Sequence, residues 1–324
     1  MQLCRPPVLC SLPLPLPLPL LRRKRSTTFR ASMGRTSTLS RFPRIAHHDL
    51  MLDVIATCES LLGPDLLPSS VPDNVLSFQS EAGTSIGSLD VRHGSPGSAV
   101  DFILESWLHC QIPNGALDIT TLFAFLNDST DAPHFLLEII QSSPTSLVLL
   151  LDLLPRRDLA LSANYVDKFY QDTQVDKQRQ QVEMLPQVLP YRSTSLYIRS
   201  ILSPTAIAVR INCGEDGQGR MKEIIHTQVE SAAKEVLQIW FDKCARSSEQ
   251  MEETERSYIL KRDGMTRKIL ETDLVDNMSR IFGADVANRV VGEIQKGYSF
   301  TKLQEDLAAK AKVRMPAEND NKGI

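Results

Sequence analysis

Two acidic residues lie inside apolar runs, where charged side chains are uncommon. Glu138 is the central residue of "FLLEIIQ", and Asp152 lies near the end of "SLVLLLDLLP". A carboxyl group that is buried without a counter-charge has a raised pKa and can hold a proton near neutral pH. Such a group is suited to general acid catalysis, in which it donates a proton to the reacting molecule.

The neighbours of these two acids suggest different roles. Asp152 is followed by Arg156 and Arg157, so neutralisation by one of these arginines is the expected explanation for it. Glu138 has no basic residue beside it. It is either a proton donor or a structural carboxylate that faces water at an edge or meets an arginine from elsewhere in the chain.

Other catalytic and cofactor motifs are absent from the sequence. There is no G-x-G-x-x-G, no P-loop, no H-E-x-x-H and no G-x-S-x-G. The adjacent pair His47–His48 is expected at the edge of the fold, and no metal site is predicted. Redox chemistry would therefore need electrons from a partner protein. Four cysteines are far apart and are expected to be buried, reduced thiols: Cys58, Cys110, Cys213 and Cys244.

The elements that would position Glu138 are strands. "HFLLEIIQ" and "SLVLLLDLLP" are short apolar runs joined through "SSPTS", which predicts an antiparallel hairpin. Strand alternation places Leu136, Glu138 and Ile140 on one face. Because both runs are apolar on both faces, the sheet is expected to be covered on both sides.

The remaining patterns predict further strands and several helices. Residues 99–113 favour a strand, and 195–203 with 206–212 favour a second strand pair, whereas the Pro-, Ser- and Gly-rich residues 64–98 favour mostly loop. The expected fold class is α/β: an α/β/α sandwich with a largely antiparallel central sheet covered by helices on both faces. Helices are predicted at 49–63, 221–245, 252–281 and 284–297.

Charge divides the chain. Residues 1–48 hold nine Lys or Arg and no acid, which leaves 27 basic and 39 acidic residues in the rest. An Arg- and Ser-rich segment without acids is typical of an organelle transit peptide, although a disordered tail is the alternative. We expect a transit peptide at 1–40, a single domain at 41–300 and a polar, disordered tail at 301–324. An acidic body argues against nucleic-acid binding, and no stretch is long and apolar enough to span a membrane.

Four segments together resemble one known family. "FLNDSTDAPHFLLEIIQSSPTSLVLLLDLLPRRDL", "FYQDT", "LPYRSTSLYIRSILSPTA" and "SAAKEVLQIWFDKC" are similar to the red chlorophyll catabolite reductases of plants. The resemblance runs from about Phe42 to about Tyr298. It implies a sheet between helices, as in the ferredoxin-dependent bilin reductases. It also implies reduction of the linear tetrapyrrole red chlorophyll catabolite to the primary fluorescent catabolite.

The resemblance also implies partners and a location. The electron donor would be reduced ferredoxin, with no tightly bound cofactor. The protein would act in the chloroplast stroma as a homodimer, and an upstream chlorophyll-catabolic oxygenase is a further expected partner. Ferredoxins are acidic, so docking needs a local basic patch. The candidates are "LKRDGMTRK" (Lys261, Arg262, Arg267 and Lys268) and the pair Arg156–Arg157.

Three site residues are carried over from the family. Glu138 matches a pocket glutamate, and Asp273 matches an aspartate in the segment before "FG", with Asp276 one turn later. Both would be catalytic and would contact substrate. Leu202, in "RSILSP", matches a position that shapes the pocket; Phe or Val is familiar there, so the stereochemistry of the product stays open. The alternative function is a non-catalytic tetrapyrrole-binding or photoprotective scavenger protein.

Overall fold

The centre of the molecule is one antiparallel sheet. The computed structural model describes residues 42–112, 115–247 and 251–297, and within them eight strands pair in the order β1-β2-β3-β4-β5-β6-β8-β7. Every neighbouring pair is antiparallel. The strands are β1 (Phe78–Gln79), β2 (Ser85–His93), β3 (Val100–Ile112), β4 (Gly115–Leu126), β5 (His134–Ser143), β6 (Ser146–Leu154), β7 (Val188–Pro190) and β8 (Ile207–Asn212).

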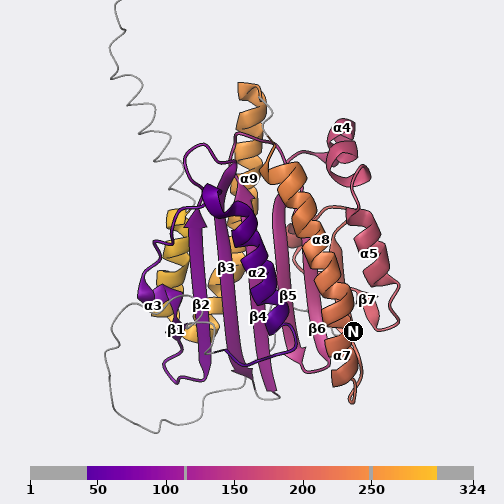
Figure 1. Cartoon of the computed structure of the whole chain (residues 1–324). Helices are drawn as coiled ribbons and strands as arrows, with labels where there is room; N and C mark the ends of the chain where they lie inside the picture. The colour runs from indigo at the N-terminus through magenta and orange to yellow at the C-terminus, as the bar shows by residue number, and fades with distance from the viewer. Residues whose placement is uncertain (1–41, 113–114, 248–250, 298–324) are drawn as a thin grey trace, which may run out of the picture.

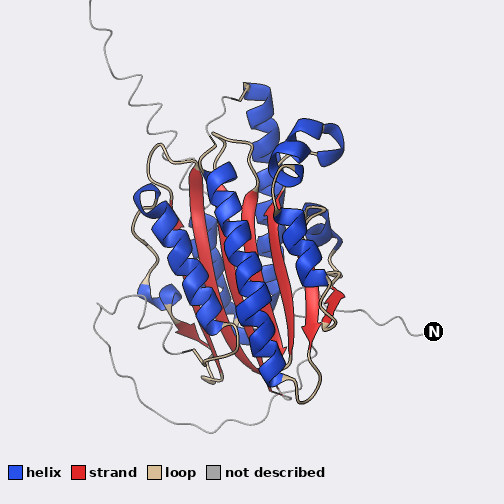
Figure 2. Cartoon of the chain, turned by 45° about the vertical axis from the view of Figure 1, so that its right-hand side comes forward, coloured by secondary structure: helices blue, strands red, loops and turns tan. Residues whose placement is uncertain are grey.

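Helices cover both faces of this sheet. Figure 1 shows α2, α7 and α8 in front of the strands and α9 behind them, and Figure 2 shows the same layers after rotation. The predicted α/β/α sandwich is therefore confirmed. The main helices are α2 (His48–Leu62), α5 (Val175–Glu183), α7 (Gln218–Ile224), α8 (Glu230–Trp240) and α9 (Glu253–Phe282); residues 284–297 are also helical. Short helices are α3 (Asp73–Leu76), α4 (Ala163–Val166) and α6 (Leu196–Ile201), with single π-turns at Asp167–Gln171, Ile225–Val229 and Phe241–Ala245.

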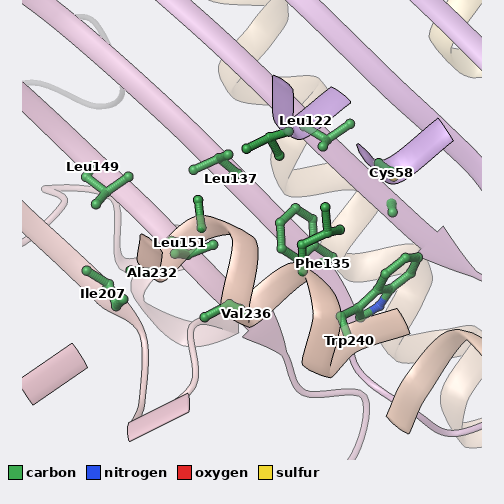
Figure 3. Close-up of a cluster of buried hydrophobic side chains, with 14 of the residues drawn as sticks. Cys58, Leu122, Phe135, Leu137, Leu149, Leu151, Ile207, Ala232, Val236 and Trp240 are labelled. Atoms are coloured by element: carbon green, nitrogen blue, oxygen red, sulfur yellow. The ribbon is translucent and has the colours of Figure 1, made fainter. Parts of the chain in front are cut away.

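The face beneath α2 and α8, which we call the α8 face, is a closed hydrophobic core. Val236 and Trp240 of α8 pack on Phe135 and Leu137 of β5 (Figure 3). Each of these side chains is at most 1% exposed. The indole Nε1 of Trp240 donates to the backbone oxygen of Pro133 at 3.0 Å, so the one polar atom of this side chain is also satisfied. This face therefore forms the main hydrophobic core of the fold.

One prediction from local sequence is wrong, and one strand was not predicted. Residues 64–98 are not mostly loop, because β2 pairs along its whole length with β3. Its alternation is a strand pattern that the surrounding Pro, Ser and Gly obscured: Leu89 and Val91 lie in the cluster beneath α9, whereas Arg92 binds Glu59 of α2 at 2.5 Å. The unpredicted strand is β4, because the local sequence pattern indicates neither a helix nor a strand there.

Of the second expected strand pair, 195–203 with 206–212, only the latter strand is present. β8 is present, but its supposed partner is the short helix α6. Ser195 caps this helix, because its hydroxyl accepts from the backbone N–H of Ile198 at 3.3 Å. Ile198 and Ile201 then point into the cluster beneath α9, a burial that a helix achieves and that the apolar run alone did not distinguish from a strand.

Buried histidines and thiols complete the core. His47 and His48 do not lie at the edge of the fold: His47 is fully buried and its Nδ1 contacts Gln141 Oε1 at 2.9 Å. Burial raises the pKa of Cys110 to about 12 and that of Cys244 above its usual range, so both remain thiols. In the described part of the chain no three metal-binding side chains are grouped, and no helix there is long and apolar enough to cross a bilayer.

Candidate active site

The opposite face of the sheet, which we call the α9 face, is less closed. It is covered by α6, α9 and the helical residues 284–297, whose apolar side chains form a second cluster. At the centre of the strands, however, side chains on this face are only half-buried. They are Leu104, Ile119, Thr121, Glu138, Val148 and Ala208. Since the equivalent positions on the α8 face are fully buried, the α9 face is where a ligand has room to contact the sheet.

Glu138 lies in a polar row at the middle of this face. The register pairs Ser106 with Thr121, and Thr121 with Glu138. Two hydroxyls and a carboxylate therefore stand side by side on β3, β4 and β5. The hydroxyl of Thr121 donates to Oε1 of Glu138 at 3.2 Å. Leu136 and Ile140 flank Glu138 on the same face, as strand alternation predicts.

This environment changes the first interpretation of Glu138. The residue is half-buried instead of enclosed, and Thr121 supplies a hydrogen bond to it. An apolar floor with one accessible, hydrogen-bonded carboxyl group fits a proton-transfer site, because the acid can reach both a bound molecule and water. The hydroxyl of Thr121 helps to fix the orientation of the Glu138 carboxyl group through Oε1.

Asp152 is also on the α9 face, and its expected arginine partner is wrong. Arg156 pairs with Asp263, and Arg157 pairs with Asp131 and Glu255. Among the described residues Asp152 makes no ion pair. Its side chain is 1% exposed and accepts hydrogen bonds from the backbone N–H of Ser203 at 2.7 Å and from the Ser203 hydroxyl at 2.5 Å. Burial raises the pKa of Asp152 to about 7, although the Ser203 hydrogen bonds act to lower it.

This carboxyl group makes stability depend on pH. Between the free-chain value of 3.8 and the folded pKa of about 7, the folded state holds a proton that the unfolded chain has lost. The contribution of Asp152 to the free energy of unfolding is therefore full below the lower value and is lost as the pH rises through the upper one, by about 4 kcal/mol in total. We expect Asp152→Asn to gain stability relative to the wild type across this range. Urea unfolding at both ends of the range measures it, and a difference that does not change with pH would contradict the assignment.

The structure places Leu202 on the same face as Glu138. Leu202 follows the last residue of α6, is half-buried and packs against the cluster beneath α9. Asp273 belongs to α9, but its side chain lies outside the described residues, as does that of Asp276. Described residues on either side of this segment, Ile269 and Met278, do join the cluster on the α9 face. The role of Asp273 therefore stays a prediction.

A buried charged network fixes α9 against the sheet. Arg156, at the end of β6, binds both carboxylate oxygens of Asp263 in α9, at 3.0 and 2.5 Å. His134 Nε2 lies 3.1 Å from the same carboxylate, and its Nδ1 accepts from the backbone N–H of Leu126. His134 is therefore the Nε2–H tautomer. Although burial acts to raise it, Arg156 and His134 hold the pKa of Asp263 well below its usual range.

Several arginines of the predicted basic docking patch bind other groups within the fold. Arg156 is 1% exposed, Arg262 donates to the backbone oxygen of Pro155 at 2.7 Å, and Arg267 pairs with Asp101. The exposed basic residues that remain from the predicted patch are Lys261 and Lys268. They share one side of α9 with two exposed apolar side chains, Tyr258 and Met265.

Comparison with known proteins identifies the family. Residues 46–296 match the family model described as red chlorophyll catabolite reductase (RCC reductase). The chain belongs to this family. Its relatives include red chlorophyll catabolite reductase 1, chloroplastic, from Oryza sativa subsp. japonica, which is 54% identical over 257 residues that cover 78% of each chain. The Hordeum vulgare red chlorophyll catabolite reductase is 54% identical over 200 residues, which cover 61% of this chain and 98% of that protein.

A further relative extends the assignment. The Arabidopsis thaliana red chlorophyll catabolite reductase, chloroplastic, is 42% identical over 264 residues, which cover 79% of this chain and 82% of that protein. Membership makes this chain an oxidoreductase of chlorophyll breakdown and a chloroplast protein, as the resemblance implied. The phytochromobilin synthase of tomato, solved in complex with biliverdin, has the same fold, with a TM-score of 0.58 at 16% identity and coverage of 76% of this chain and 80% of that chain.

Proposed function

We propose that this RCC reductase family member reduces the linear tetrapyrrole red chlorophyll catabolite to the primary fluorescent catabolite on the α9 face of the sheet. The observation that carries the proposal is the accessible carboxyl group of Glu138, which lies beside the Thr121 hydroxyl and between the apolar side chains of Leu136 and Ile140. An extended, largely apolar ligand is held there by burial. A tetrapyrrole complex of a protein with the same fold supports this choice of ligand.

The proposed electron donor is reduced ferredoxin, in the chloroplast stroma and with no tightly bound cofactor. Ferredoxin delivers single electrons, so protons must accompany them if a neutral, reduced tetrapyrrole is to leave the enzyme. Glu138 would supply or position one of these protons, and Asp273 is the proposed second proton-handling residue. The homodimer and an upstream chlorophyll-catabolic oxygenase as partner stay predictions from the family resemblance.

The absence of a nucleotide motif from the sequence leads to the test of this proposal. Purified protein with NADPH alone should not turn over, and ferredoxin with a ferredoxin reductase should restore activity under anaerobic conditions. That activity should fall as salt rises, because charged docking is screened. Turnover with NADPH alone would contradict the proposal. A wild-type protein that binds the catabolite tightly but never reduces it would favour the scavenger alternative.

The exposed side of α9 that carries Lys261 and Lys268 is our candidate for the ferredoxin surface. It combines positive charge with apolar contact area, and α9 also covers the face that holds Glu138. Replacing both lysines by Glu in this assay should raise the KM for ferredoxin and leave catabolite binding unchanged. Lys222→Glu on α7, an exposed lysine on the opposite layer (Figure 1), is the matched control.

A further inference from the structure

Asp152 is a buried acid that the proposed mechanism does not use. Its register places it close to Glu138, because Glu138 pairs with Leu150 and Leu136 pairs with Asp152. Glu138 and Asp152 are thus diagonal neighbours on the same face, with Cα atoms about 7–8 Å apart. Since the pairing of β6 with β8 ends at Leu151, the Asp152 side chain lies just beyond the paired region, where the chain turns from α6 into β8.

Two hydrogen bonds connect the Asp152 side chain to that turn. Both of its oxygens accept from Ser203, one from the backbone N–H and one from the hydroxyl. The Ser203 hydroxyl oxygen in turn accepts from the backbone N–H of Thr205 at 3.1 Å. The backbone oxygen of Ser203 accepts from the N–H of Ala206 at 3.3 Å. One carboxyl group therefore organises the whole connection between α6 and β8.

The turn also carries part of the α9 face. Leu202, directly before Ser203, packs into the cluster there, and Ile201 is 7% exposed in the same cluster. A carboxyl group buried without a cation is costly to the fold. Stability therefore does not explain why the Asp152 carboxyl group is buried beside Ser203. A requirement to place this turn correctly for the ligand does explain it.

We propose that Asp152 is a positioning residue for the substrate: through Ser203 it holds the turn at residues 202–206, and with it Leu202, against the ligand-contacting face beside Glu138. This inference rests on the proposed function. Without the Asp152–Ser203 hydrogen bonds, the turn samples other conformations, and only a fraction of molecules is ready to bind. The loss appears in substrate affinity and not in the proton transfer itself.

The decisive variants are Ser203→Ala, which removes the hydroxyl donor, and Asp152→Asn, which places an amide N–H₂ against the Ser203 donors. The control is Ser200→Ala, because Ser200 lies on α6 just before the turn, is exposed and, within the described part of the chain, bonds only the backbone oxygen of Tyr197. The probe is red chlorophyll catabolite, bound anaerobically without an electron donor. Its Kd follows from quenching of tryptophan fluorescence, and KM and kcat follow from the ferredoxin assay.

Both variants should raise Kd and KM by roughly ten-fold, in line with the loss of one hydrogen bond, and leave kcat close to the wild-type value. Ser200→Ala should change none of these. A wild-type protein that neither binds nor reduces the catabolite refutes the proposed function itself. An active wild type with unchanged Kd and KM in Ser203→Ala refutes the positioning role, even if that variant melts earlier.

Discussion

Replacing Glu138 by Gln should lower kcat by roughly 10²–10⁴, the range for loss of a general acid. Gln keeps the shape of the side chain and an oxygen that can accept from the Thr121 hydroxyl, but it has no acidic proton. The Kd for red chlorophyll catabolite should change little, because apolar burial supplies most of the binding. Thermal stability should also change little, because Glu138 is half-buried and Gln can keep the hydrogen bond with the Thr121 hydroxyl.

The matched control for this variant is Glu105→Gln. Glu105 lies on β3, two strands away from β5 in the same sheet, but is buried on the α8 face, where no substrate is expected. The Glu105→Gln substitution should therefore alter stability without altering turnover per folded molecule. Single-turnover kinetics together with thermal melting separate the two effects. A stable Glu138→Gln protein with near-normal turnover would rule out the proton role, and a strongly destabilised one would indicate a structural role instead.

The second large effect is expected at Arg156, where substitution by Met should destabilise the protein by roughly 3–5 kcal/mol. Arg156 and Asp263 are 1% and 3% exposed, so removal of the guanidinium leaves a buried carboxylate with His134 as its remaining close partner. The donors from Arg156 to the backbone oxygens of Thr130 and Ala132 are lost as well. Since this network attaches α9 to the sheet, the α9 face should loosen with it.

The adjacent arginine provides a control of the same type. Arg157 pairs with Asp131 and Glu255 but is partly exposed, so Arg157→Met should cost less than Arg156→Met, although it also removes the arginine from the buried Asp131. Urea denaturation of both variants measures the difference. Replacing the two partners together, Arg156→Met with Asp263→Leu, should recover much of the loss, because the stranded charge is gone. If Arg156→Met and Arg157→Met lowered the free energy of unfolding equally, this would contradict the Arg156–Asp263–His134 network as the anchor of α9.

The sequence by itself determined the parts of this protein that depend on local periodicity. The alternation around Glu138 fixed which face of β5 it occupies, and the hairpin of β5 and β6 and the amphipathic helix α8 also follow from spacing alone. Covered layers on both sides follow from runs that are apolar on both faces. The family could be identified from the sequence because several blocks of residues match it in order. Such a match does not depend on where each residue lies in the fold.

Only the tertiary structure decided which groups meet. The nearest arginines in sequence suggested a partner for Asp152, yet Arg156 reaches Asp263, 107 residues away, and Asp152 is held by Ser203, 51 residues away. Likewise, the apolar run around Ile198 forms the helix α6, because a helix buries both Ile198 and Ile201 in the cluster on the α9 face. Pairing across such separations depends on strand register and packing, which no local pattern encodes, and the half-buried setting of Glu138 arises in the same way.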